Sequence, residues 1–111
     1  MSFLYVFVGG GAGAALRYAF SLMLPSPWAT QAVNVLGSLL LGWLLARGID
    51  GPARALLATG FCGGFTTYST FNAETLSLAQ SGDWTMVAVN IVLTFGVCLM
   101  AGALGMWMGR Q

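Results

Sequence analysis

The chain has 111 residues, of which 58% are hydrophobic and only 6% are charged. Four basic and three acidic residues cannot cover the surface of a soluble domain, so the composition excludes a water-soluble fold and indicates a membrane protein. The net charge of +1 also excludes a nucleic-acid partner, because phosphate binding requires clustered basic side chains.

Four apolar stretches predict four transmembrane helices. Crossing a hydrocarbon core of about 30 Å takes roughly 20 helical residues, so four spans occupy most of the chain. The predicted spans are 3–24, 29–46, 53–79 and 85–108. We therefore expect residues 1–111 to form one all-α membrane domain, with the lipid bilayer as its surroundings.

The first span carries a glycine cluster, and the charged residues lie mostly near span ends. Gly9 and Gly13 have the GxxxG spacing that lets two helix backbones approach closely. Arg17 can snorkel toward the membrane interface. The other arginines would lie inside if the N-terminus is cytoplasmic, a three-to-one bias that does not exclude insertion in both orientations.

Polar side chains recur every fourth residue on one face of the second span and one face of the fourth. Such side chains in lipid face a bundle interior or a water-filled path. The two sets are Thr30, Asn34 and Ser38, and Asn90, Thr94 and Cys98. Interhelical hydrogen bonding is sufficient for Ser38 and Thr94, whereas the amide of Asn34 needs several partners and predicts a functional role.

The third span is interrupted by a polar run from Gly63 to Thr70, which contains two glycines and four hydroxyl side chains. Irregular backbone at membrane depth is tolerated where it is buried in protein or lines a cavity. The run predicts a helix broken at mid-membrane around Gly63 and Gly64, with backbone groups free to coordinate ions. A kinked but continuous helix is the alternative.

Aromatic and acidic side chains follow this run. Tyr68 and Phe71 are three residues apart and share a helical face, and their ring edges carry partial positive charge that can face an anion. Glu74 is the only acidic residue near a span interior, and it is placed either to brace the bundle or to lie at a pore mouth. The cysteines Cys62 and Cys98 lie within spans, where we expect small apolar residues rather than a disulfide or a metal site.

Three segments together resemble one known family. The glycine-rich segment ends in Arg17, an asparagine motif begins at Asn34, and a long signature surrounds the polar run. The matching stretches are 9–18, 34–38 with Gly42, and 60–71. These motifs are similar to those of the bacterial Fluc (CrcB) fluoride channels, and the resemblance covers essentially the whole chain.

The resemblance implies passive fluoride export across the bacterial inner membrane. It implies a dual-topology homodimer with antiparallel subunits and two fluoride pathways. The aromatic side chains that contact fluoride would be Tyr68 and Phe71. A sodium ion at the dimer interface would be held by backbone carbonyls of Gly63 and Thr66. The predicted pathway residues are Asn34, Tyr68, Phe71, Thr30, Ser38, Thr67 and Thr70.

The sequence departs from the family pattern at two positions: Tyr68 replaces a phenylalanine and Asn72 replaces a serine. Both add polar groups near the expected pathway. They leave open how conductance and anion contacts are affected.

Two other functions stay open, while no nucleophile–base pair or metal cluster supports an enzyme. A small proton-coupled multidrug transporter would need a carboxylate within a span, and Glu74 is the only candidate. A non-conducting partner subunit of a heterodimer is kept open by the arginine bias, because a strict dual-topology protein should show nearly none.

Overall fold

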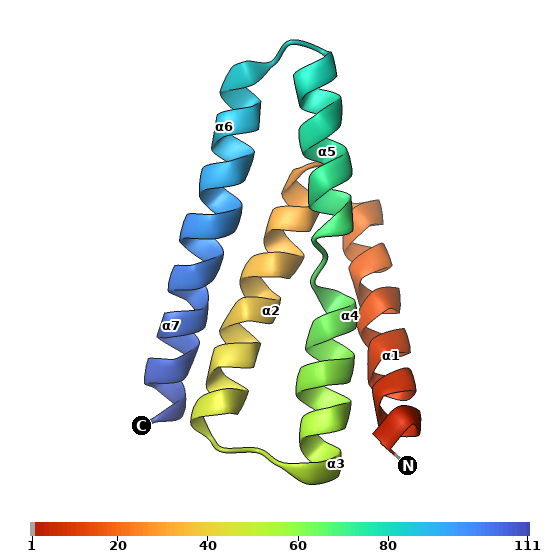
Figure 1. The fold of residues 1–111 in the computed structure, drawn as a ribbon, viewed down its shortest axis with the longest axis vertical. Coiled ribbons are helices and arrows are strands. Elements are labelled where there is room, and N and C mark those ends of the chain that lie inside the picture. The colour runs from red at the N-terminus through yellow and green to blue at the C-terminus, as the bar shows by residue number, and fades with distance from the viewer. Residues whose placement is uncertain (1) are drawn as a thin grey trace.

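The computed structural model describes residues 2–111, which form an up-and-down bundle of helices (Figure 1). The first two segments are α1 (Ser2–Met23) and α2 (Trp28–Ala46). The third comprises α3 (Gly51–Ala53), η1 (Arg54–Cys62), α4 (Gly63–Phe65) and, after a break, α5 (Ser69–Gln80). The fourth comprises α6 (Trp84–Val92), η2 (Leu93–Val97) and α7 (Cys98–Gly109).

The all-α architecture predicted from the sequence is confirmed. Three helices are long and apolar enough to cross a membrane: Ser2–Met23, Trp28–Ala46 and Trp84–Gly109. The remaining predicted span, 53–79, is divided by the break between α4 and α5. Both chain ends lie at the same end of the bundle as α3 (Figure 1).

Glycines allow the first and third segments to pack backbone against backbone. A Cβ at Gly13 would lie 2.7 Å from Phe65 N, and a Cβ at Gly64 would lie 2.9 Å from Gly10 Cα. Gly9 likewise faces the backbone of Gly60 and Phe61. The close approach predicted from the Gly9–Gly13 spacing is confirmed, with η1 and α4 as the partner.

The second and fourth segments form an equally close pair. A Cβ at Gly42 would lie 2.9 Å from Gly102 C, and one at Gly105 would lie 2.9 Å from Leu39 C. Without a hydrophobic drive between helices in lipid, such close van der Waals packing is a main source of association. The bundle is thus built from two tightly packed helix pairs, α1 with η1–α4 and α2 with α7.

The third helix breaks two to three residues later than the sequence predicted. Gly63 and Gly64 are both helical, and the chain becomes extended at Thr66, with φ −85° and ψ 158°. The expectation of a break around the glycine pair was therefore wrong in position. Position 64 has no room for a side chain because α1 lies against it. Gly63, in contrast, has no neighbouring atom within 4 Å of its Cβ position among the described residues.

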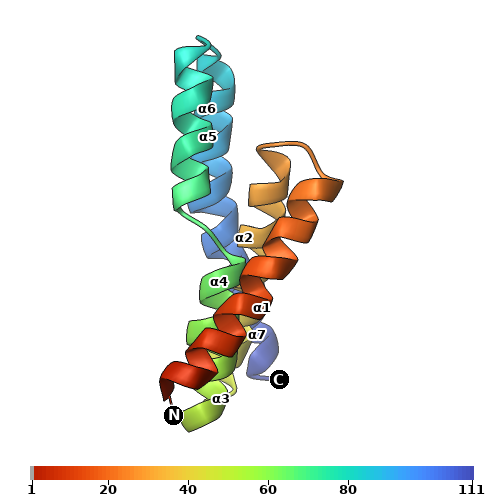
Figure 2. The same ribbon diagram turned by 90° about the vertical axis from the view of Figure 1, so that its right-hand side faces the viewer.

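Two stretches of π-helix were not predicted. In η1 the hydrogen bonds reach one residue further than in an α-helix, and Gly63 N–H still donates to Ala58 O. Such wide turns are frequent at functional sites. Beyond the break α5 runs beside α6 as a hairpin, whose tip lies apart from the turn joining α1 and α2 (Figure 2).

Replacing Gly13 by alanine should destabilise the bundle, because the new methyl group would meet the backbone of Phe65 and Gly64. Overpacking of this kind costs about 1–3 kcal/mol. Gly11→Ala is the matched control, since nothing lies within 4 Å of its Cβ position on the same helix. Thermal unfolding in detergent should show a lower midpoint for Gly13→Ala alone; equal midpoints for the two variants would contradict the packing.

Candidate functional site

The break begins at Thr66, where the carbonyl oxygen of Cys62 accepts two hydrogen bonds. Thr66 N–H donates to Cys62 O at 3.0 Å, and Thr66 Oγ1 donates to the same oxygen at 2.8 Å. The hydroxyl thus folds back onto the last regular turn, while the backbone of Thr66 turns extended. This local bond ends the helix without leaving the threonine hydroxyl unpaired in an apolar bundle.

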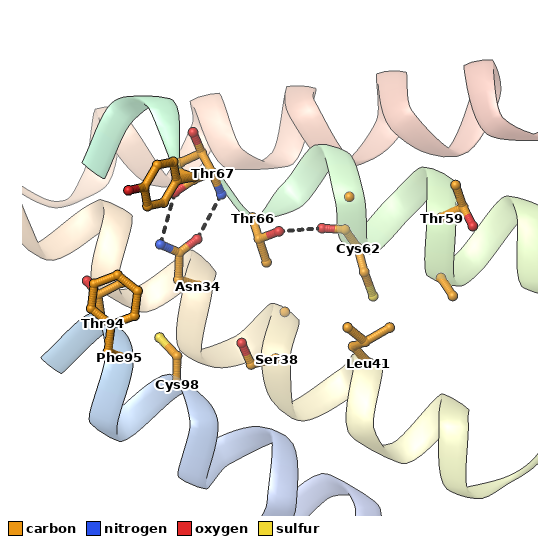
Figure 3. A pocket seen from close by; sticks show the side chains of 14 residues that line it. Asn34, Ser38, Leu41, Thr59, Cys62, Thr66, Thr67, Thr94, Phe95 and Cys98 are labelled. Carbon is orange, nitrogen blue, oxygen red and sulfur yellow. Dashed lines mark hydrogen bonds between the residues drawn. The ribbon is translucent and has the colours of Figure 1, made fainter. Parts of the chain in front are cut away.

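The amide of Asn34 spans the break from α2 (Figure 3). Asn34 Nδ2 donates to Thr67 O at 3.1 Å, and Asn34 Oδ1 accepts from Thr67 N at 2.8 Å. The side chain is buried, with 7% of its surface exposed. Because an amide nitrogen carries two hydrogens, Asn34 retains one donor that these two bonds do not use.

The break deprives several carbonyl oxygens of their usual helical partners, and Gly63 O and Thr66 O are two of them. In a continuous α-helix Gly63 O would accept from Thr67 N–H and Thr66 O from Thr70 N–H. Here Thr67 N–H donates to Asn34 Oδ1, and Thr70 N–H donates to Thr67 Oγ1 at 3.2 Å. Carbonyl oxygens are ligands for hard cations. Among residues 2–111 no cluster of three His, Cys, Asp or Glu side chains could hold a metal.

Arg17 is directed into the bundle rather than toward the interface. Its Nε donates to Gly64 O at 3.0 Å, and the side chain is half-buried. Gly64 lies two residues before Thr66, and the Tyr68 N–H that would bond to its carbonyl in a continuous helix lies beyond the break. The snorkelling that the sequence suggested for Arg17 is therefore replaced by a bond to a carbonyl of the broken helix.

An open cavity of about 430 Å³ lies beside the break and contains several predicted site residues (Figure 3). Asn34, Ser38 and Cys98 point into it from α2 and α7. From the third segment it is lined by Gly63, Thr66, Thr67 and Tyr68. The structure thus brings both sodium candidates and four of the seven pathway candidates to one surface.

A smaller cavity of about 220 Å³ lies on the other side of Thr67. Thr30 and Thr70 line it together with Arg17, and Tyr18 and Ser21 add further hydroxyl groups from α1. Thr67 lines both cavities. The polar groups of the break therefore face two separate spaces that meet at one residue.

The two predicted aromatic residues occupy different environments. Phe71 is buried, with 3% of its surface exposed, whereas Tyr68 is 63% exposed. Their ring centroids are 5.6 Å apart, and Phe95 stands edge-on to Phe71 at 5.8 Å. Tyr68 lines the larger cavity, but Phe71 lines neither of the two cavities in the described chain.

Sequence analysis missed Gln31, which is buried and donates to Asn90 Oδ1 at 2.5 Å and to Thr94 Oγ1 at 2.8 Å. The available signal was its spacing, three residues before Asn34.

Glu74 accepts a hydrogen bond from Ser26 in the α1–α2 turn, so it braces α5 against that turn. The other carboxylate oxygen of Glu74, Oε1, is buried and has no hydrogen-bond partner within the described part of the chain.

Comparison with known proteins places these features in a family. The family model described as CrcB-like protein, Camphor Resistance (CrcB), matches residues 4–106. A protein of Shewanella sp. (strain ANA-3) named fluoride-specific ion channel FluC is 42% identical over 92% of this chain and 90% of its own. Proteins of the same name from Sorangium cellulosum and Paramagnetospirillum magneticum are 40% and 35% identical, covering 96% and 99% of this chain and 93% of each relative.

These relatives carry the name of a channel rather than of an enzyme or a multidrug transporter. The alignments cover nearly the whole of this chain and of each relative. The residues matched by the family model include the broken third segment and Asn34. The chain is accordingly a multi-pass membrane protein and belongs to the CrcB (FluC) family of fluoride channels.

Proposed function

We propose that the protein is a fluoride channel that exports the ion passively across the plasma membrane, with two pathways in an antiparallel homodimer. The observation that carries the proposal is the broken third helix held by Asn34, in a chain whose relatives are named fluoride-specific ion channels. Both cavities beside this break offer hydrogen-bond donors to an anion.

The chemistry of the site suits a small, strongly hydrated anion. A conducting pathway has to replace water while holding the ion weakly enough for it to leave. The unused Nδ2 hydrogen of Asn34 and the hydroxyls of Thr30, Ser38, Thr67 and Thr70 are neutral donors of this kind. Arg17, at the smaller cavity, raises the local concentration of anions.

The aromatic pair supplies donors of another type. Aromatic ring edges carry partial positive charge and attract an anion less strongly than a cation does. Phe71 is held by Tyr68 on one side and by Phe95 on the other. In the proposed pathway fluoride passes the edge of Phe71, which lines neither cavity in the single subunit.

A second subunit is supported by the open face beside the break. The larger cavity is open and carries polar groups on a mostly apolar lining, and Tyr68 and Gly63 are exposed on it. Irregular backbone does not face lipid within the hydrocarbon region, so this face requires a protein cover. A second copy in the opposite orientation would bring its own break against this one.

The freed carbonyls support a sodium ion in that interface. Gly63 O and Thr66 O lack their helical donors, and the same pair from a second subunit would double the number of oxygen ligands. A bound cation would offset the repulsion among these carbonyl oxygens. It would thereby tie the two breaks together.

The arginines favour a heterodimeric assembly as a second candidate. Arg47 follows α2, Arg54 begins η1 and Arg110 follows α7, and these three ends lie together at one end of the bundle (Figure 1). Such a bias favours one orientation in the membrane. A subunit inserted in only one orientation would need an oppositely inserted homologue to complete the antiparallel pair.

Removing a pathway donor should slow fluoride efflux from liposomes without dissociating the dimer. Phe71→Ile keeps apolar bulk but removes the ring edge, and Asn34→Ala removes the amide. We expect each rate to fall by about tenfold or more, since a loss of about 1.4 kcal/mol at the barrier is tenfold. Tyr68→Phe should change the rate little, because it restores the residue typical of the family.

The pathway assignment is contradicted if Phe71→Ile and Asn34→Ala both dimerise and conduct normally. A large loss in Tyr68→Phe would instead show that the tyrosine hydroxyl donates to the ion.

Gly63 tests the dimer and the cation site together. Nothing lies within 4 Å of its Cβ position in one subunit, so Gly63→Val should fold but should fail to pair or conduct. Gly11→Val is the matched control, because Gly11 is also helical, exposed and free of neighbours. Single-molecule photobleaching in dilute vesicles should show one subunit for Gly63→Val and two for the control. A Gly63→Val dimer that conducts equally with and without sodium would refute the site.

A further inference from the structure

Two amide side chains are buried deep in the bundle, away from the break. Gln31 has 6% of its surface exposed and Asn90 has 1%. Burying amides in an apolar interior is costly unless their donors and acceptors are paired. Neither residue lines the cavities beside the break, and the hydrogen bonds of both are made within the bundle.

These amides start a chain of hydrogen bonds that ends on the backbone of Phe71. Gln31 Nε2 donates to Asn90 Oδ1 at 2.5 Å. Asn90 Nδ2 donates to Thr75 Oγ1 at 3.0 Å, and Thr75 Oγ1 donates to Phe71 O at 2.8 Å. Every donor in this series of hydrogen bonds points from Gln31 toward Phe71, an arrangement in which each bond strengthens the next.

This series of hydrogen bonds connects α2, α6 and α5 close to the point where the third helix is interrupted. Gln31 belongs to α2, Asn90 to α6, and Thr75 and Phe71 to α5. Because the helix is interrupted at Thr66, the rotation of α5 about its axis is not set by η1 and α4. The hydrogen bonds therefore supply a link between α2 and the first turns of α5 that the broken helix lacks.

The two ends of the Gln31 amide differ in their hydrogen bonding. Gln31 Oε1 is buried and has no hydrogen-bond partner among residues 2–111, while Nε2 contacts Asn90 and Thr94. A side chain kept only for packing would avoid an unpaired oxygen in this interior. The donors of Gln31 are the feature that the structure uses.

We propose that Gln31, Asn90 and Thr75 are positioning residues for fluoride conduction, which act by holding the backbone of Phe71 so that its ring edge faces the pathway. This inference rests on the proposed function, since it assigns Phe71 a place beside the ion. None of the three residues touches the ion. Their effect passes through Phe71 O and the orientation of α5.

Thr75 offers the sharpest test, because valine has nearly the same shape without the hydroxyl. Thr75→Val should slow fluoride efflux from liposomes by about threefold to tenfold, the rate equivalent of one interhelical hydrogen bond. Thr75→Ser keeps the hydroxyl and should restore most of the rate. Thr85→Val is the control for the same change at an exposed position on α6, and it should leave efflux unchanged.

A second background separates positioning from general damage. If Thr75 acts through Phe71, Thr75→Val should add no further loss once Phe71→Ile is present. An equal fractional loss in both backgrounds, or a Thr75→Ser protein as slow as Thr75→Val, would overturn the proposal.

Hydrogen exchange gives a readout that does not depend on transport. Amides of α5 should exchange faster in Thr75→Val than in the wild type or in Thr75→Ser, and unchanged exchange would overturn the positioning role. A wild-type protein that conducts no fluoride, but whose α5 loosens in Thr75→Val, would reject the proposed function while leaving the hydrogen-bonded link in place.

Discussion

The pair of hydrogen bonds between Asn34 and Thr67 is the interaction on which the site depends. A helix broken inside a membrane exposes backbone groups that lipid cannot satisfy. One amide on α2 satisfies both the N–H and the C=O of Thr67, at 2.8 and 3.1 Å. By taking the N–H of Thr67, it also frees Gly63 O from its helical role, so the same side chain stabilises the break and creates a candidate ligand.

Close backbone packing at glycines fixes the helices on both sides of this break. Gly13 and Gly64 bring α1 against α4, and Gly42 and Gly105 bring α2 against α7. Arg17 then reaches from α1 to Gly64 O, which lies just before the extended residue. The break is therefore held from two sides, by an amide on α2 and a guanidinium on α1.

The sequence allowed the helical segments and their approximate ends to be predicted, because apolar runs of membrane length leave few alternatives. It also located Asn34 and the polar run. It misplaced the break, since Gly63 and Gly64 signal flexibility whereas the tertiary bonds of Thr66 and Thr67 decide where the helix ends. The inward direction of Arg17 and the link from Gln31 to Phe71 depend on side chains that meet only in the folded bundle, so spacing along the chain could not reveal them.

Selective fluoride conduction by the unmodified protein is the central claim, and liposomes containing the purified protein test it most directly. An ion-selective electrode would follow fluoride efflux and, in matched vesicles, chloride efflux. Rapid fluoride release with no chloride release above that of protein-free liposomes is the expected result. Equal release of both anions, or no release of fluoride from vesicles shown to contain the dimer, would contradict the account.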